Sequence, residues 1–319
     1  MMLGRFPLVA RVGVLVALTG TALVAHGAPF AYVPNEKSGT ISVIDTAEDR
    51  VVADISVGTE PRGTAVSADG KRLFVSTQPD SVVVVDTATR RVTTRIVTGN
   101  SPEAVYLSAD GRWLTVANEE SNDISVIDTE TLKKAFALRT LGKNPEHAAW
   151  SPDGRWIYAG AEDGDTVDVI DVAARKVVKS INVGKRPRGI AFTPDGRRAY
   201  VAAEVAGKVY VIDTTRQEVS DVVTAGTRAN NLAMHPSGER VYVANGGDGT
   251  VSVIDTASHK ITATIEVGKR PWGMALTPDA KKLYVANGRS NSVSVIDTVS
   301  HRKIADIPVG SFPWGVAIK

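Results

Sequence analysis

The stretch VSVIDTASHKITATIEVGKRPWGMALTPDAKKLYVANGRSNSVSVIDT (251–298) begins and ends with the same six residues. Its VID aspartate occurs seven times, at intervals of 41 to 43 residues: Asp45, Asp86, Asp128, Asp171, Asp213, Asp255 and Asp297. A period of about 40–45 residues is typical of one four-stranded propeller blade. The repeat therefore predicts an all-β chain, a seven-bladed β-propeller of four-stranded antiparallel blades.

One repeat divides into four expected strands. They cover 271–276, 282–286, 292–297 and 303–309, and the third alternates apolar and polar residues as a half-buried strand does. Asp-Gly or a related pair follows the first strand, and Asn-Gly follows the second, which are residues that favour tight turns. No window has a helical period, so we expect almost no helix in the propeller.

The two ends of the repeat region complement each other. The first expected strand, 31–34, matches the second strand of a repeat, whereas the last, 313–318, matches a first strand. Together they complete one blade, which would pair the two ends of the chain and remove an exposed sheet edge. We therefore expect one closed propeller domain over residues 28–319.

The repeat motifs also carry a family resemblance. YVAN (242–245 and 284–287), VSVIDT (251–256 and 293–298) and PVG followed by PWG (308–315) resemble the YVTN-type β-propeller repeat family across the whole of 28–319. This resemblance implies a seven-bladed fold and an exported or surface protein of bacteria or archaea. NEKSGTISVID (35–45) and GSFPWGV (310–316) further resemble periplasmic propellers associated with quinone-cofactor-dependent alcohol catabolism.

Residues 1–27 have the pattern of a signal peptide. Arg5 and Arg11 precede an uncharged apolar stretch, 12–25. Ala25-His26-Gly27 provides small residues for cleavage before Ala28. The stretch is shorter than the roughly 20 residues of a membrane-spanning helix. We expect cleavage near Gly27/Ala28, location in the periplasm or secretion, and no membrane anchor in the mature chain; a retained anchor is the alternative.

Charge and motifs exclude several classes of function. The chain has 37 basic and 35 acidic residues, and removal of residues 1–27 leaves 35 of each, so net charge gives no indication of a nucleic-acid partner. The absence of cysteine excludes thiol catalysis and covalent haem attachment. The sequence has no G-x-S-x-G, P-loop, dinucleotide or HExxH motif. We expect no cofactor, and on balance no enzyme.

Comparison of the seven copies with one another separates scaffold from candidate site. The VID aspartates recur in every blade and are expected to form turns. The two residues that follow the proline at the start of each first strand vary most between copies. They should lie at the channel mouth, which is the end of the disc where the turns into the first strands and the loops after the second strands meet. The nine ring residues are Arg62, Glu103, Glu146, His147, Arg188, Asn230, Asn231, Trp272 and Trp314.

Three interpretations of the ring residues are open. They are a solvated rim without function, a binding surface for a small molecule or a periplasmic protein, or a metal site formed by Glu103, Glu146, His147 and Asn231. We predict a monomeric, exported, non-catalytic binding or scaffold protein that uses the channel mouth. The alternative is a metal-dependent lactonase or lyase at the same place.

The remaining tryptophans have other expected roles. Trp150 replaces a smaller apolar residue of a first strand and should pack in the core. Trp113 and Trp156 begin second strands where other copies have Arg or Lys, so they should be partly exposed. They could mark a contact on the side of the disc.

Overall fold

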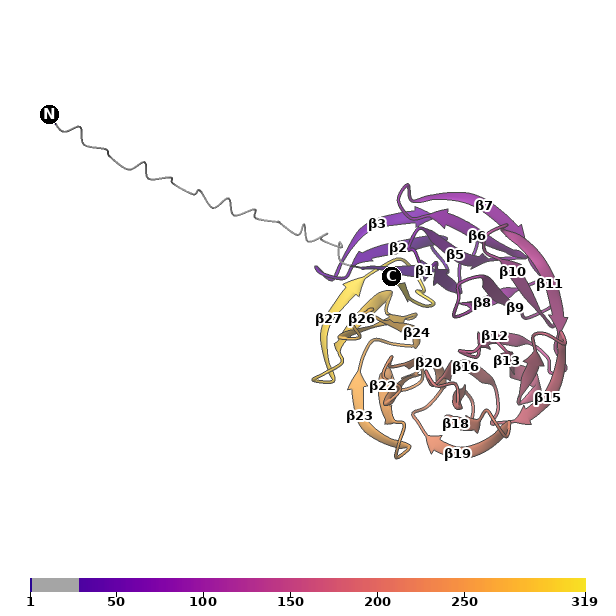
Figure 1. Cartoon of the computed structure of the whole chain (residues 1–319). Helices are drawn as coiled ribbons and strands as arrows, with labels where there is room; N and C mark the ends of the chain where they lie inside the picture. Colours follow the sequence, from indigo (N-terminus) through magenta and orange to yellow (C-terminus); the bar gives the residue numbers. More distant parts are fainter. Residues whose placement is uncertain (2–28) are drawn as a thin grey trace.

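The computed structural model describes Met1 and residues 29–319, so the predicted signal peptide over 1–27 lies almost wholly outside the described residues. Seven four-stranded antiparallel sheets surround one axis (Figure 1). The predicted all-β, seven-bladed propeller is therefore confirmed. No helix within residues 29–319 has the length and apolar character needed to cross a membrane.

Each blade has an innermost, a second, a third and an outer strand. The innermost strands are β28 (Ala317–Ile318), β4 (Thr64–Val66), β8 (Pro102–Leu107), β12 (Pro145–Trp150), β16 (Pro187–Phe192), β20 (Ala229–Met234) and β24 (Pro271–Leu276). The second strands are β1 (Phe30–Asn35), β5 (Arg72–Thr77), β9 (Trp113–Asn118), β13 (Trp156–Ala161), β17 (Arg198–Ala203), β21 (Arg240–Asn245) and β25 (Lys282–Asn287).

The third and outer strands continue each sheet toward the rim. The third strands are β2 (Thr40–Asp45), β6 (Ser81–Asp86), β10 (Asp123–Asp128), β14 (Thr166–Asp171), β18 (Lys208–Asp213), β22 (Thr250–Asp255) and β26 (Ser292–Asp297). The outer strands are β3 (Arg50–Ser56), β7 (Arg91–Val97), β11 (Lys133–Arg139), β15 (Lys176–Asn182), β19 (Glu218–Thr224), β23 (Lys260–Glu266) and β27 (Arg302–Pro308). One short 3₁₀ helix, η1 (Glu162–Gly164), follows β13.

The two ends of the described chain share one blade. Its strand order is β28-β1-β2-β3, and β1 pairs with β28 through Ala31 opposite Ile318 and Tyr32 opposite Ala317. The backbone N–H groups of Phe30 and Lys319 donate to each other's carbonyl oxygens at 3.0 and 3.2 Å. The expected closure of the ring is confirmed.

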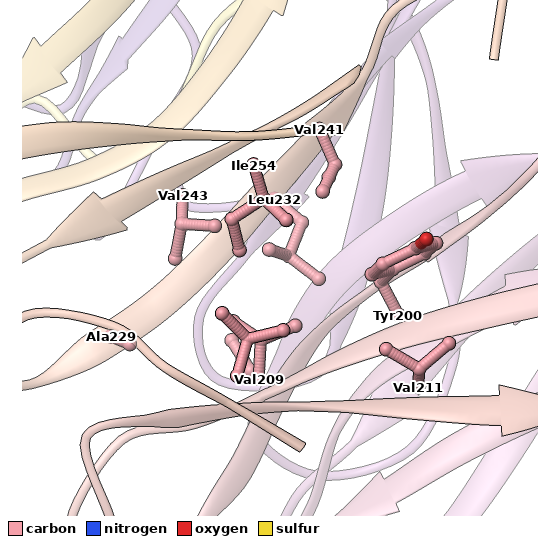
Figure 2. Packing of buried hydrophobic residues seen from close by; sticks show 10 residues of the cluster. Tyr200, Val209, Val211, Ala229, Leu232, Val241, Val243 and Ile254 are labelled. Carbon is pink, nitrogen blue, oxygen red and sulfur yellow. The ribbon is translucent and has the colours of Figure 1, made fainter. Parts of the chain in front are cut away.

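The core lies between neighbouring blades. Tyr200 of β17 packs with Val241 of β21 and Ile254 of β22, so the facing sheets of two blades share one apolar cluster (Figure 2). Related clusters fill the other blade junctions. Trp150 is buried in one of these clusters, as expected. The chain has no cysteine, so burial of this area rather than disulfides holds the blades together.

The VID aspartates form turns, as predicted. Asp45 Oδ1, for example, accepts a hydrogen bond from the Ala47 N–H at 2.8 Å, and each of the other six accepts one from a backbone N–H group two or three residues further along. These bonds stabilise the ionised carboxylate, and they hold the pKa of Asp128 at about 2 together with Arg112. The seven aspartates are therefore scaffold.

Trp113 and Trp156 are half-buried at the start of β9 and β13. The guanidinium groups of Arg112 and Arg155 lie over their rings at 5.2 and 4.5 Å from the centroids. Each exposed ring face is thus covered by its sequence neighbour. The expected partial exposure is confirmed.

Deletion of 313–319 tests ring closure. The truncated chain lacks β28, which leaves the edge of β1 unpaired and exposes Ala31 and Tyr32 of the core. We expect a lower melting temperature and new protease cleavage within 29–57, measured by circular dichroism and limited proteolysis. A truncated protein that melts like the full-length chain would contradict the closure.

Candidate functional site

Irregular pairing of the innermost strands places the ring residues. Five of these strands shift register against the second strand at the point where the ring residues occur. The shifts lie between Pro102 and Val105, Pro145 and His147, Pro187 and Ile190, Ala229 and Asn231, and Pro271 and Met274. The regular blade pattern is therefore interrupted at the channel mouth.

Glycines allow the innermost strands of neighbouring blades to approach each other. A Cβ atom on Gly189 would lie 2.7 Å from the Asn231 Cα atom, and one on Gly273 would lie 2.7 Å from the Gly315 Cα atom. Backbone fills the space beside these two residues, which explains why Gly189 and Gly273 carry no side chain.

Aromatic side chains and His147 fill the channel. The imidazole ring stacks on Trp314 with centroids 6.1 Å apart and an interplanar angle of 17°. The ring centroids of Trp314 and Trp272 lie 6.4 Å apart. The Tyr106 hydroxyl is hydrogen-bonded to His147 Nδ1 at 2.6 Å. Burial, reinforced by the charge of Arg188, lowers the pKa of His147 to about 3. His147 is therefore a neutral, fixed group.

This filling leaves little open space in the channel. The cavity at the mouth has a volume of about 10 Å³ and is lined by Glu146, His147, Arg188, Asn230, Asn231, Trp272, Gly273 and Trp314. Such a volume holds about one water molecule. A second cavity of about 110 Å³ lies beside His147, Asn231 and Trp314 on the side of Tyr106 and Met274.

The solvated-rim interpretation of the ring residues is wrong. Six of the nine are buried, namely Glu103, Glu146, His147, Arg188, Asn230 and Trp314, while Arg62, Asn231 and Trp272 are half-buried. The expected polar surface is also less open than its residue types suggested, because these side chains pair with one another. The structure thus brings together the sequence-predicted residues, but inside the channel mouth.

Arg188 is the centre of a buried ionic network. Its three guanidinium nitrogens lie 2.5, 2.7 and 2.8 Å from carboxylate oxygens of Glu146, Glu162 and Glu204. These residues come from β12, η1 and the loop after β17, so the network joins two neighbouring blades. Burial and the adjacent Glu146 raise the pKa of Glu162 to about 9. Arg188 and Arg186 oppose this shift, because both favour the ionised carboxylate.

The network extends across two further blades through Glu204. One oxygen of this carboxylate lies 3.5 Å from Arg228 Nη1 and 3.2 Å from Arg270 Nη2, and the other lies 3.6 Å from Arg186 Nε. Arg186 Nε also lies 2.8 Å from Glu162. Four arginines thus surround three glutamates at the channel mouth.

Sequence comparison of the repeats missed five of these residues. Glu162 and Glu204 occupy the first position of the loop after the second strand, and Arg186, Arg228 and Arg270 precede the first-strand proline position. Both positions vary between copies, with Glu, Gln or Gly at the first and Arg in three consecutive copies at the second. The same comparison extended by two positions would have found them.

The residues of the alternative metal site have partners within the protein. Glu103 is ion-paired with Arg62, Glu146 with Arg188, and His147 is hydrogen-bonded to Tyr106. Within residues 29–319 no three histidine, aspartate or glutamate side chains lie together in a way that could hold a metal ion. The arginines and Tyr106 already occupy the groups that the sequence suggested as ligands.

Two polar atoms at the mouth cavity have no hydrogen-bond partner among the described residues: Asn230 Oδ1, an acceptor, and Trp272 Nε1, a donor. Asn230 Nδ2 is fixed by the Pro271 carbonyl at 3.3 Å. Gly288 makes room for the indole, since a Cβ atom there would lie 2.9 Å from Trp272 Cε3. Two residues that line the cavity therefore carry one donor and one acceptor without a protein partner among the described residues.

Two family models match parts of this chain. The model described as "Lactonase, 7-bladed beta-propeller" matches residues 174–303, and the one described as "YNCE-like beta-propeller" matches residues 64–169 and 109–198. Each covers less than half of the chain, and both describe propellers. The protein is thus a seven-bladed β-propeller with an ion-paired, aromatic channel mouth. No curated protein sequence matches it.

Many solved structures share the fold. A chain of Kuenenia stuttgartiensis hydrazine synthase is 26% identical, with a TM-score of 0.76, over 84% of this chain and 92% of that one. A functionally unknown protein from Desulfotomaculum acetoxidans is 19% identical, with a TM-score of 0.80, over 91% and 98%. A putative 6-phosphogluconolactonase from Bacteroides fragilis is 18% identical, with a TM-score of 0.77, over 93% and 99%. The last two likenesses concern the fold alone.

Arg188→Met tests the ionic network. Removing the guanidinium leaves buried carboxylates without their cation, which typically costs about 3–5 kcal/mol. We expect this loss in the free energy of unfolding, measured by urea denaturation. Arg197→Met is the control, because Arg197 lies exposed in the turn between β16 and β17 and should change stability by less than about 0.5 kcal/mol. Equal effects of the two changes would contradict the network.

The raised pKa values predict a pH dependence. Burial raises the pKa of Glu103 to about 8 and that of Glu162 to about 9, from an ordinary 4.5. The folded protein therefore keeps protons that the unfolded chain loses. Above the ordinary histidine pKa of 6.5, where the buried His147 no longer contributes, stability falls as pH rises from about 7 to about 9. Urea midpoints should show this fall, and Glu162→Gln should make it shallower. A stability that rises over this range would contradict the assignment.

Proposed function

We propose that this protein is a non-catalytic binding protein that engages a small molecule or a protein partner at the channel mouth. The observation that carries the proposal is the pair of unsatisfied polar atoms at the mouth cavity, Asn230 Oδ1 and Trp272 Nε1. A buried polar atom without a partner is costly, and a bound ligand or ordered water can supply the missing hydrogen bond. Trp and Arg, which gather there, are also the residues that most often dominate binding energy.

The geometry supports binding over catalysis. A general base needs a free lone pair near the substrate. The carboxylates of Glu103 and Glu146 face arginines, and burial holds His147 neutral against Tyr106 and Trp314. These groups are suited to fixing the shape of the mouth.

We further propose that the protein acts as a monomer in the periplasm or outside the cell, after cleavage near Gly27/Ala28. The pattern of residues 1–27 supports export, and the YVTN-type motifs support a role among exported propellers, including those associated with quinone-cofactor-dependent alcohol catabolism. N-terminal sequencing of protein from a periplasmic fraction should begin at or near Ala28. Soluble cytoplasmic protein that begins at Met1 would contradict export.

A lactonase activity is the second candidate, and the match of the lactonase model to residues 174–303 favours it. Hydrolysis of a lactone panel, followed in a pH-stat with and without a chelator, tests it. We expect no rate above buffer. Hydrolysis that disappears in His147→Ala would replace the binding proposal with catalysis.

Trp272→Phe tests the binding proposal. The change keeps an aromatic ring but removes the free indole N–H. A thermal-shift screen of neutral and charged small molecules and short peptides should find compounds that stabilise the protein. We expect their affinity for Trp272→Phe to fall about tenfold, as the loss of one buried hydrogen bond predicts.

Trp150→Phe is the matched control, because Trp150 Nε1 is also buried without a partner but lies in a blade core. The control should leave affinity unchanged. A screen without any hit, or equal losses in both variants, would contradict binding at the mouth. Trp314 is not substituted in this test, since it is buried against His147 and its loss would also destabilise the fold.

A further inference from the structure

A groove beside the mouth cavity offers the space that the channel lacks. Its volume is about 400 Å³, and it lies between the loop after β17 and the turn that leads into β20. Arg186 and Arg228 stand on its sides, and its remaining lining is Glu204, Val205, Ala206, Gly207, Ala225, Gly226 and Thr227. This is the size of a small-molecule site.

The charges of the ion-pair network do not balance. Arg186, Arg188, Arg228 and Arg270 contribute four positive charges. The carboxylates paired with them are those of Glu146, Glu162 and Glu204. Even with all three ionised, four guanidinium groups face three carboxylates.

Two of the arginines reach solvent. Burial, with smaller contributions from the charges of Arg188 and Arg228, lowers the pKa of Arg270. The side chains of Arg186 and Arg228 are 42% and 54% exposed. Both line the groove and lie 3.5–3.6 Å from Glu204, and both remain partly exposed, whereas Arg188 is enclosed by glutamates.

The backbone gives a separate indication. Arg186, Arg228 and Arg270 have φ angles of 63°, 57° and 57°, in the left-handed region that favours glycine or asparagine. The equivalent residue of the blade β12–β15 is Asn144, which suits this conformation. Conformational preference therefore does not explain arginine in three consecutive blades.

We propose that this groove binds a small organic anion through a carboxylate or phosphate group held between Arg186 and Arg228. The planar guanidinium fork matches both groups and donates two hydrogen bonds to either. The exposed Val205 side chain and Ala206 and Ala225 provide an apolar wall for the rest of the molecule. This inference rests on the proposed binding function and names the class of its ligand.

The test is calorimetric titration of the full mature protein with citrate, inorganic phosphate and, as an uncharged match, glycerol. We expect citrate or phosphate to bind, with an affinity that falls as salt is raised, and glycerol not to bind. The tighter of the two anions distinguishes a carboxylate from a phosphate ligand. Arg228→Gln should weaken the anion at least about tenfold, because it removes charge-assisted hydrogen bonds.

Arg216→Gln is the matched control, since Arg216 is exposed in the turn between β18 and β19, away from the groove. It should bind the anion like the unchanged protein. Failure of both anions to bind at about 10 mM, or equal weakening by the two substitutions, overturns the anion site. If neutral compounds still bind in a manner that depends on Trp272, the anion site alone has failed; if no compound does, the proposed function has failed too.

Discussion

Closing seven sheets around one axis crowds their innermost strands, and most features of this protein follow from that constraint. The ring closes by pairing β28 with β1, and the innermost strands then approach so closely that Gly189 and Gly273 face backbone atoms of the next blade. Where a larger residue such as His147 replaces glycine at the equivalent position, its side chain enters the channel. At the channel mouth such side chains leave cavities of only about 10 and 110 Å³.

The same crowding explains why charged residues are buried at the mouth. Arg188 and Glu204 lie where neighbouring blades converge, and neither has room to reach bulk water. Such groups persist only when they are paired, because an isolated buried charge costs several kcal/mol. The network therefore joins successive blades and holds the rim of the groove in place. Its surplus of arginines leaves positive charge that the protein itself does not neutralise.

The repeats predicted the fold because each blade repeats the same pattern of strands and turn residues. The VID aspartates and the split blade at 31–34 and 313–318 were sufficient to predict blade number and closure. They also predicted that variable residues would meet at one end of the disc. Burial of those residues could not be predicted, because it depends on how residues of neighbouring blades, such as Arg62 and Glu103, pair with each other. A wider comparison of the repeats would have found Arg228 as a candidate, but its ion pair with Glu204 is visible only in the structure.

Backbone hydrogen–deuterium exchange tests most directly whether the channel mouth carries the ligand. It is measured with and without the compound that stabilises the protein most. The account predicts slower exchange in the loops 204–207 and 225–231, with no change in the turns 67–71 and 277–281 at the other end of the disc. Protection confined to the turns 67–71 and 277–281, which line another cavity beside β1 and β28, would contradict the account.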